Sequence, residues 1–182
     1  RIQMASYVTA FNRLYQAGFS PNLVERPRLE KHMQKVLNDV VKMRGLITPA
    51  SKETHIQKAI FEAIQTVSRN LVCMLELQIN AYWASRPGHF VMLNAHTLRE
   101  TQQMTQQTLL TIAHALYEGN PQPILANNEK LNEIVAELRQ LIKEQQDDNF
   151  SETPIHGYVW LTIELARQLE LLSHLICRAL RK

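Results

Sequence analysis

Residues 50–85, ASKETHIQKAIFEAIQTVSRNLVCMLELQINAYWAS, and residues 89–118, HFVMLNAHTLRETQQMTQQTLLTIAHALYE, decide the fold of this chain. Neither stretch contains Gly or Pro, the two residues that most disfavour a helix interior. Thr48 is a good N-cap residue, and Pro49 suits the first position of a helix. The sequence therefore predicts two long helices that form a hairpin over residues 49–118, both far longer than the mean helix of about 11–12 residues.

Shorter helices are expected on both sides of this hairpin. The apolar spacing predicts helices over residues 3–17 and 28–44, which stop at Gly18 and Gly45, respectively. A fifth helix begins near residue 127 or 128, with Asn127 or Asn128 as its N-cap, and a sixth covers residues 157–180. No repeat of 30–45 residues, which would indicate a solenoid, is visible.

The fold class that follows is all-α: an antiparallel helical bundle of about six helices with two long central helices. Residues 1–182 form one domain, made of N-terminal helices in 1–45, the hairpin in 49–118 and C-terminal helices in 127–181. The expected core faces of the third and sixth helices are Ile56, Ile60, Ile64, Val67, Leu71, Met74, Leu75 and Tyr82, and Trp160, Leu161, Leu165, Leu169, Leu172, Leu175, Ile176 and Leu180.

The middle of the fourth helix is unusually polar. Between Arg99 and Thr108 only Met104 is clearly apolar. Such a segment either is exposed to solvent, lines a groove or oligomer contact, or packs its Gln and Thr side chains against other polar groups. The simplest interpretation is an exposed stretch on a helix that is held at both ends.

Charge and cysteine content exclude several classes of protein. Net charge is +3, with 12 Lys/Arg and 6 Asp/Glu in residues 1–90 but 8 and 11 in residues 91–182. Cys73 and Cys177 are too few for a disulfide framework, and their apolar surroundings predict buried thiols. No signal peptide is recognisable, and no run approaches the roughly 20 apolar residues of a membrane-spanning helix.

The search for catalytic or metal-binding motifs is negative. The chain has no Gly-rich phosphate loop, G-x-S-x-G, H-E-x-x-H or C-x-x-C motif. The best metal candidates are His89, His96 and Glu100, which fall on one helix face but lack a further ligand. His114 and His174 lie among apolar residues and are expected in the core or at its boundary. The chain is thus not expected to be an enzyme or to hold a cofactor or metal, and no catalytic or binding residue is assigned.

Basic residues recur along the second helix and its approach. They lack interleaved aromatic residues, so no nucleic-acid partner is expected. A charged solvent face explains them, as does contact with an anionic membrane surface, which would attract each nearby Lys or Arg by about 1 kcal/mol. These residues are Arg26, Arg28, Lys31, Lys35, Lys42 and Arg44.

The order and spacing of segments resemble the cytoplasmic helical domain of fusaric-acid-resistance-type inner-membrane proteins, a family that includes aromatic-acid efflux pumps. The resemblance covers roughly residues 36–181: Arg44 before a loop, Glu53 opening a long helix, and a second long helix ending in ALYEGNPQP (115–123). A short variable helix and a Leu-rich final helix that ends in basic residues follow. The family has no catalytic or ligand motif in this part to transfer to particular residues.

The resemblance implies a soluble domain at the cytoplasmic face of the inner membrane, serving assembly or coupling in an efflux or transport protein. Its partners would be its own membrane-embedded segments or helices of partner proteins, with a homo-oligomer and an anionic membrane surface as further possibilities. The alternative from another class is a free-standing cytosolic helical adaptor or chaperone-like module that binds a partner helix.

Overall fold

The computed structural model describes the backbone of residues 1–19, 28–84, 87–146 and 154–181; within these ranges, the side chains of 83–98, 141–142 and 144–157 are not described. All regular structure in the described residues is helical, which confirms the all-α expectation. The six helices are α1 (Ile2–Gly18), α2 (Leu29–Thr54), α3 (Lys58–Ala84), α4 (Pro87–Glu118), α5 (Gln122–Gln146) and α6 (Pro154–Leu180).

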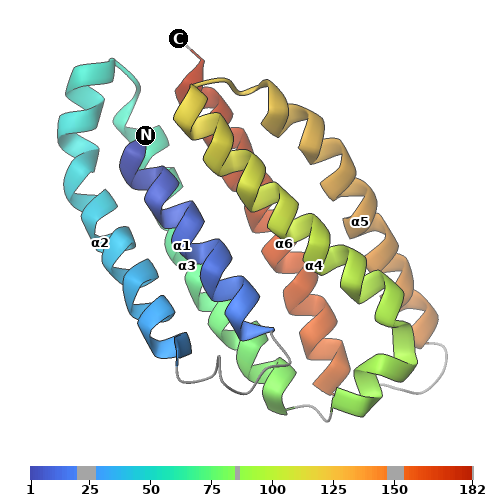
Figure 1. Cartoon of the computed structure of the whole chain (residues 1–182). Helices are drawn as coiled ribbons and strands as arrows, with labels where there is room; N and C mark the ends of the chain where they lie inside the picture. Colours follow the sequence, from blue (N-terminus) through green and yellow to red (C-terminus); the bar gives the residue numbers. More distant parts are fainter. Residues whose placement is uncertain (20–27, 85–86, 147–153, 182) are drawn as a thin grey trace.

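Consecutive helices run in alternating directions along one bundle axis (Figure 1). Going around the bundle, the neighbours are α1, α2, α3, α6, α5 and α4, and α4 packs against α1 to complete the circle. The chain thus consists of two three-helix halves, α1–α3 and α4–α6, joined along the α1–α4 and α3–α6 contacts. The N- and C-termini lie at the same end of the bundle (Figure 1).

The core occupies the space between the helices and is built as the apolar spacing predicts in the middle of α3 and α6. Leu71 and Leu75 of α3 and Leu169 and Leu172 of α6 are fully buried. The outer ends of the predicted faces fit less well: Trp160 is mostly exposed, and Ile56 lies before α3 begins. Apolar spacing along a helix therefore does not guarantee that an aromatic side chain on the predicted core face is buried.

The predicted boundary at Thr48-Pro49 is wrong. α2 continues through Gly45 and Pro49 to Thr54, so residues 50–85 do not form one helix. The break comes at His55, whose backbone is left-handed (φ 57°), and α3 begins at Lys58. A side-chain hydrogen bond stabilises the last turn of α2: Thr54 Oγ1 donates to the Ala50 carbonyl at 2.6 Å. Pro49 removes one backbone bond from the helix but does not end it.

The signal of a cap residue followed by proline instead marks the start of α5. The Asn120 side-chain oxygen accepts the Gln122 N–H at 3.1 Å, and the Pro121 carbonyl accepts the Leu125 N–H at 3.3 Å. Asn127 and Asn128, predicted as caps, lie inside α5 and are buried. The predicted end of α4 is confirmed: its last residue is Glu118, and Gly119 adopts the positive φ (72°) that glycine tolerates best.

Candidate functional site

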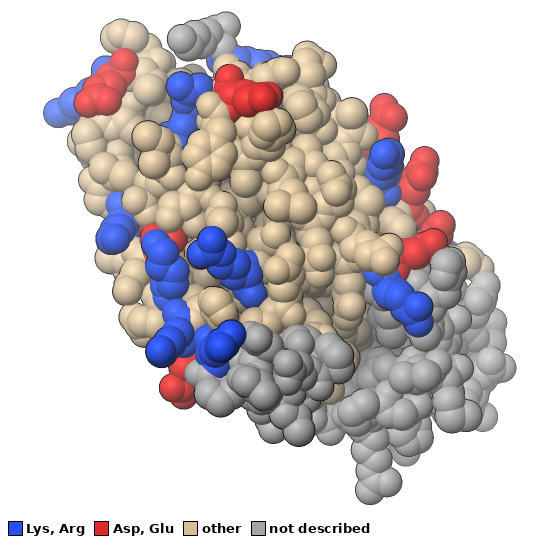
Figure 2. Space-filling model, in the orientation of Figure 1, with Lys and Arg blue, Asp and Glu red and all other residues tan. Residues whose placement is uncertain are grey.

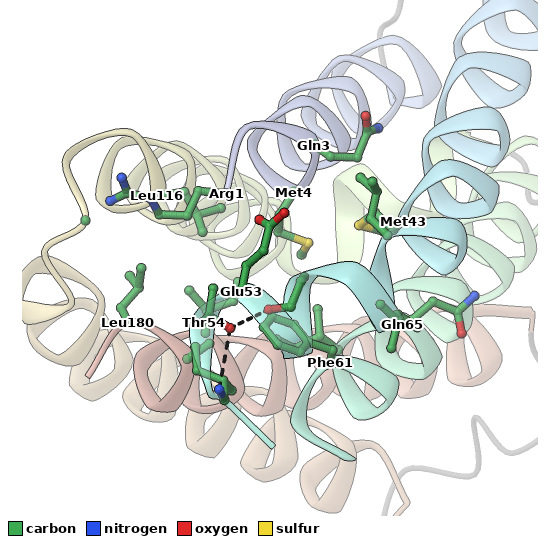
Figure 3. Close-up of a pocket in the computed structure, with 18 of the residues that line it drawn as sticks. Arg1, Gln3, Met4, Met43, Glu53, Thr54, Phe61, Gln65, Leu116 and Leu180 are labelled. Atoms are coloured by element: carbon green, nitrogen blue, oxygen red, sulfur yellow. Dashed lines mark hydrogen bonds between the residues drawn. The ribbon is translucent and has the colours of Figure 1, made fainter. Parts of the chain in front are cut away.

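A groove of about 1090 Å³ opens at the bundle end that carries both termini. Its deepest lining is apolar and comes from five helices: Met4, Met43, Ile64, Leu116 and Ile176, all almost completely buried. Figure 3 shows Met4, Met43, Phe61, Leu116 and Leu180 around this space. This hollow makes the terminal end of the bundle the candidate binding surface among the described residues.

The last three turns of α2 form one wall of the groove. Within residues 44–54 no side chain is buried, although Leu46, Ile47 and Ala50 line the groove. Leu46 is 47% exposed. This end of α2 therefore gains little from packing, because apolar burial is the main source of helix stability in a folded protein.

Charged and polar groups surround the apolar lining. Arg1 and Arg181, at the two ends of the described chain, both line the groove. Glu53 and Glu118 add two carboxylates, and Glu53 extends toward Met4 in Figure 3. An apolar floor with a charged border of both signs is suited to the apolar face of an amphipathic helix.

The simplest interpretation of the polar middle of α4, an exposed stretch, is wrong. Thr101, Thr105 and Thr108 are buried, while Arg99, Gln103 and Gln107 are exposed. The buried hydroxyls are satisfied inside the protein. Thr105 Oγ1 donates to the Thr101 carbonyl at 2.8 Å, and Thr108 Oγ1 accepts from the Asn127 side-chain amide at 2.8 Å. The alternative in which this segment packs against other polar groups is therefore correct.

Polar and aromatic groups also fill the bundle end opposite the groove. Gln78 Nε2 donates to Thr162 Oγ1 at 2.7 Å, and Thr162 Oγ1 donates to the Tyr158 carbonyl at 2.8 Å. Phe19 packs on Tyr82 and Tyr158 with ring centroids 5.3 and 6.2 Å apart. Burial raises the pKa of Tyr158 to about 12, and hydrogen bonds with Gln102 and Gln78 offset part of that effect. This end is a packed structural cluster.

The candidate metal residues are not brought together by any described contact. The side chains of His89 and His96 lie outside the described residues, and Glu100 is half-buried. No group of three His, Cys, Asp or Glu side chains that could hold a metal occurs in the described part of the chain.

Two predictions about His114 and His174 are wrong. Both side chains are exposed, at 68% and 55%, and lie beside Glu118 and Glu170 one turn away. Each histidine lies on the solvent face of its helix, four residues from a glutamate with which it can interact. The helical spacing alone would place both histidines near the core.

The two cysteines have different environments. Cys177 is buried as predicted, and burial raises the pKa of its thiol. Cys73 is exposed, which contradicts the prediction. Both thiols are free.

The basic residues of α2 are exposed along the flank of the bundle, except Arg26, which lies outside the described residues. Lys and Arg side chains gather over α1 and α2 in Figure 2, whereas both signs of charge occur over α5. Lys35 pairs with the buried Asp39 at 2.8 Å, and Gln3 and Ser6 of α1 also donate to that carboxylate. Lys35 therefore has a structural role, while Lys31 and Lys42 are left on the surface.

None of the described helices is long and apolar enough to cross a membrane.

Comparison with known proteins relates this helical domain to a membrane protein. No protein-family model matches the chain, and no solved structure matches it. Over all 182 residues, however, the chain is 69% identical to the Inner membrane protein YeeA of Escherichia coli (strain K12). The match covers 52% of that protein, so the chain spans about half the length of the curated relative it matches. The chain is thus related to part of an inner membrane protein.

Proposed function

We propose that this chain is the cytoplasmic helical domain of an inner-membrane efflux or transport protein of the fusaric-acid-resistance type, where it serves assembly or coupling. The observation that carries the proposal is the 69% identity along the whole chain with half of an inner membrane protein. The family itself, the transport role and the cytoplasmic side rest on the resemblance in the order of the helical segments.

The arrangement of the bundle supports attachment to a membrane at one end. Both termini lie at the groove end, so a link from either terminus to further polypeptide leaves from the same place (Figure 1). Exposed Arg1, Lys52 and Arg181 lie at this end. Basic residues next to membrane segments favour the cytoplasmic side and are attracted to anionic lipid.

The apolar floor of the groove supports a binding role. Its deepest part is aliphatic and thioether surface, while the titratable side chains Glu53, His55 and Glu118 also line the groove. The domain would act through contacts with its own membrane segments or with helices of a partner.

Fractionation of the native, full-length polypeptide tests this proposal. We expect an intact mass well above 21.1 kDa and retention in the membrane after carbonate washing. Protease added to inverted inner-membrane vesicles should cleave the domain, whereas protease added to intact spheroplasts should not. A polypeptide near 21.1 kDa that carbonate extracts would overturn the proposal and favour the free-standing adaptor.

A further inference from the structure

The groove end has apolar surface that the described chain does not cover. Ile2, in the first turn of α1, is 81% exposed, and Leu46 on the wall of the groove is 47% exposed. The same wall includes Pro49, which weakens the end of α2 further. An apolar-lined groove with an exposed leucine on its wall is a candidate interaction site.

The position of the termini indicates which polypeptide is closest. Arg1 and Arg181 both line the groove. In the matched E. coli protein nearly half of the polypeptide lies outside the part that this chain covers. A segment joined at either terminus begins beside the groove, where a short tether gives an effective concentration on the order of millimolar.

We propose that this groove receives the segment of the longer polypeptide that adjoins the bundle end, bound as an amphipathic helix with its apolar side chains on the accessible lining residues Leu46, Phe61 and Leu180. The proposal rests on the proposed function, since it requires a longer polypeptide. The charged border, with Glu53 and Glu118 as well as Arg1 and Arg181, fits a helix whose polar face carries both signs of charge. Docking of this segment would fix the bundle relative to the membrane and would transmit movement between the two.

Thiol accessibility at the groove wall tests this inference. In a Cys73→Ser background, which removes the exposed native thiol, Leu46→Cys places a reporter on the groove and Val41→Cys places a control on the same helix. Val41 is 70% exposed and is not part of the groove. The rate of reaction with a water-soluble maleimide is measured in the full-length protein and in residues 1–182, both in the same detergent micelles.

We expect Leu46→Cys to react at least tenfold more slowly in the full-length protein than in residues 1–182, and Val41→Cys to react within twofold in both. A photoactivatable cross-linker on Leu46→Cys should join residues outside 1–182 of the same polypeptide. Equal rates for Leu46→Cys in the two proteins would overturn the inference. Cross-links only between two differently tagged copies would do the same and would assign the groove to a second copy.

Failure of the inference and failure of the proposed function are separable in this design. A polypeptide that resists carbonate extraction but reacts freely at Leu46→Cys overturns the groove assignment alone. A polypeptide that carbonate extracts as a 21.1 kDa species overturns both.

Discussion

The two ends of the contact between α3 and α6 differ in the chemistry of their side chains. The apolar spacing in the sequence would make the two ends alike. At one end Gln78 donates to Thr162 in a buried hydrogen bond. Because the two helices are antiparallel, the same register places Leu71 opposite Leu169, and Ile64 opposite Ile176 at the other end. Ile64 and Ile176 line the groove. Among the described side chains, polar and aromatic groups therefore fill one end of the bundle, the closed end, whereas apolar side chains line the groove beside the termini.

At the groove end itself, the outer helices of the two halves differ. α5 buries residues from its first turn onward, from Ile124 to Leu138. α2 buries only Val36, Asp39, Val40 and Met43, all in its middle. The end of α2 is thus held away from the core, and the groove lies where a helix packed as α5 is would have filled the space. At this end of the bundle the corner next to α5 is therefore filled, whereas the corner next to α2 is open.

Substitutions at the midpoint of the α3–α6 contact should lower the free energy of unfolding the most. We expect Leu71→Ala and Leu169→Ala each to lower the free energy of unfolding by about 3–4 kcal/mol, because both side chains are fully buried. Urea unfolding followed by circular dichroism measures this. Leu77→Ala, at an exposed position of α3, should change the free energy by less than about 0.5 kcal/mol. A loss below about 1 kcal/mol at either buried leucine would contradict the central register.

Alkaline pH should destabilise the domain, in part through Tyr158 at the closed end. The pKa of Tyr158 is raised to about 12, so its neutral phenol favours the folded state. That contribution is complete below the ordinary pKa of about 10 and is lost as the pH rises from about 10 to 12, at a cost of about 2–3 kcal/mol. Burial also raises the pKa of Tyr7 and Tyr15, so the whole domain should be sensitive in this range.

Unfolding by urea at pH 8, 10 and 11.5 measures this dependence. Tyr158→Phe should lose less stability than the parent between pH 10 and 11.5, whereas Tyr117→Phe, at an exposed position, should follow the parent. Identical curves for the parent and Tyr158→Phe would show that the closed end does not govern alkaline unfolding.

The buried Asp39, which ties the middle of α2 to α1, should give an intermediate loss of stability when it is replaced. Asp39 accepts hydrogen bonds from Gln3 at 3.2 Å and Ser6 at 3.2 Å, and pairs with Lys35 at 2.8 Å. Asp39→Ala should lower the free energy of unfolding by about 2 kcal/mol, because buried hydrogen bonds to a charged group are lost. Lys35→Ala should cost less than about 1 kcal/mol, since that side chain is half exposed. Thermal unfolding measures both, and an equal cost for the two would contradict a buried anchor.

Much of the fold could be predicted from the sequence, because helical spacing of apolar residues reports burial directly. The faces around Leu71 and Leu169 were predicted for that reason. Boundaries were predicted less well, since Thr48-Pro49 and Asn120-Pro121 look alike in sequence but only the second begins a helix. The difference lies in the glycine before each pair: Gly119 adopts a positive φ and ends α4, whereas Gly45 stays helical inside α2.

The groove could not be predicted, because it arises from residues of five helices that are distant in sequence. Leu46 and Leu116 have the same apolar character as any core leucine, yet one is on the wall of the groove and the other is in its floor. The buried threonines of α4 were missed for a related reason. Thr105 and Thr108 have hydroxyls that donate within their own helix, and Thr108 also accepts from Asn127, so they can be buried at little cost.

The smallest effect on global stability, and the most informative about the open corner, is expected at the two prolines. Pro49 lies inside α2 and cannot donate to the Gly45 carbonyl, so Pro49→Ala should restore that bond. Since residues 44–54 bury no side chain and can open separately from the core, the gain should be local. We expect amide hydrogen exchange of residues 50–54 to slow at least tenfold, with less than about 1 kcal/mol of change in the global free energy of unfolding.

Pro121→Ala is the matched control, because Pro121 lies immediately before α5, where its missing N–H removes no helix bond. Exchange in α5 should stay within about twofold of the parent. If Pro49→Ala instead left exchange of residues 50–54 unchanged, the end of α2 would already be held firmly, and the groove wall would be a rigid surface. If exchange slows as expected, Pro49 is the residue that keeps this wall of the groove weakly held.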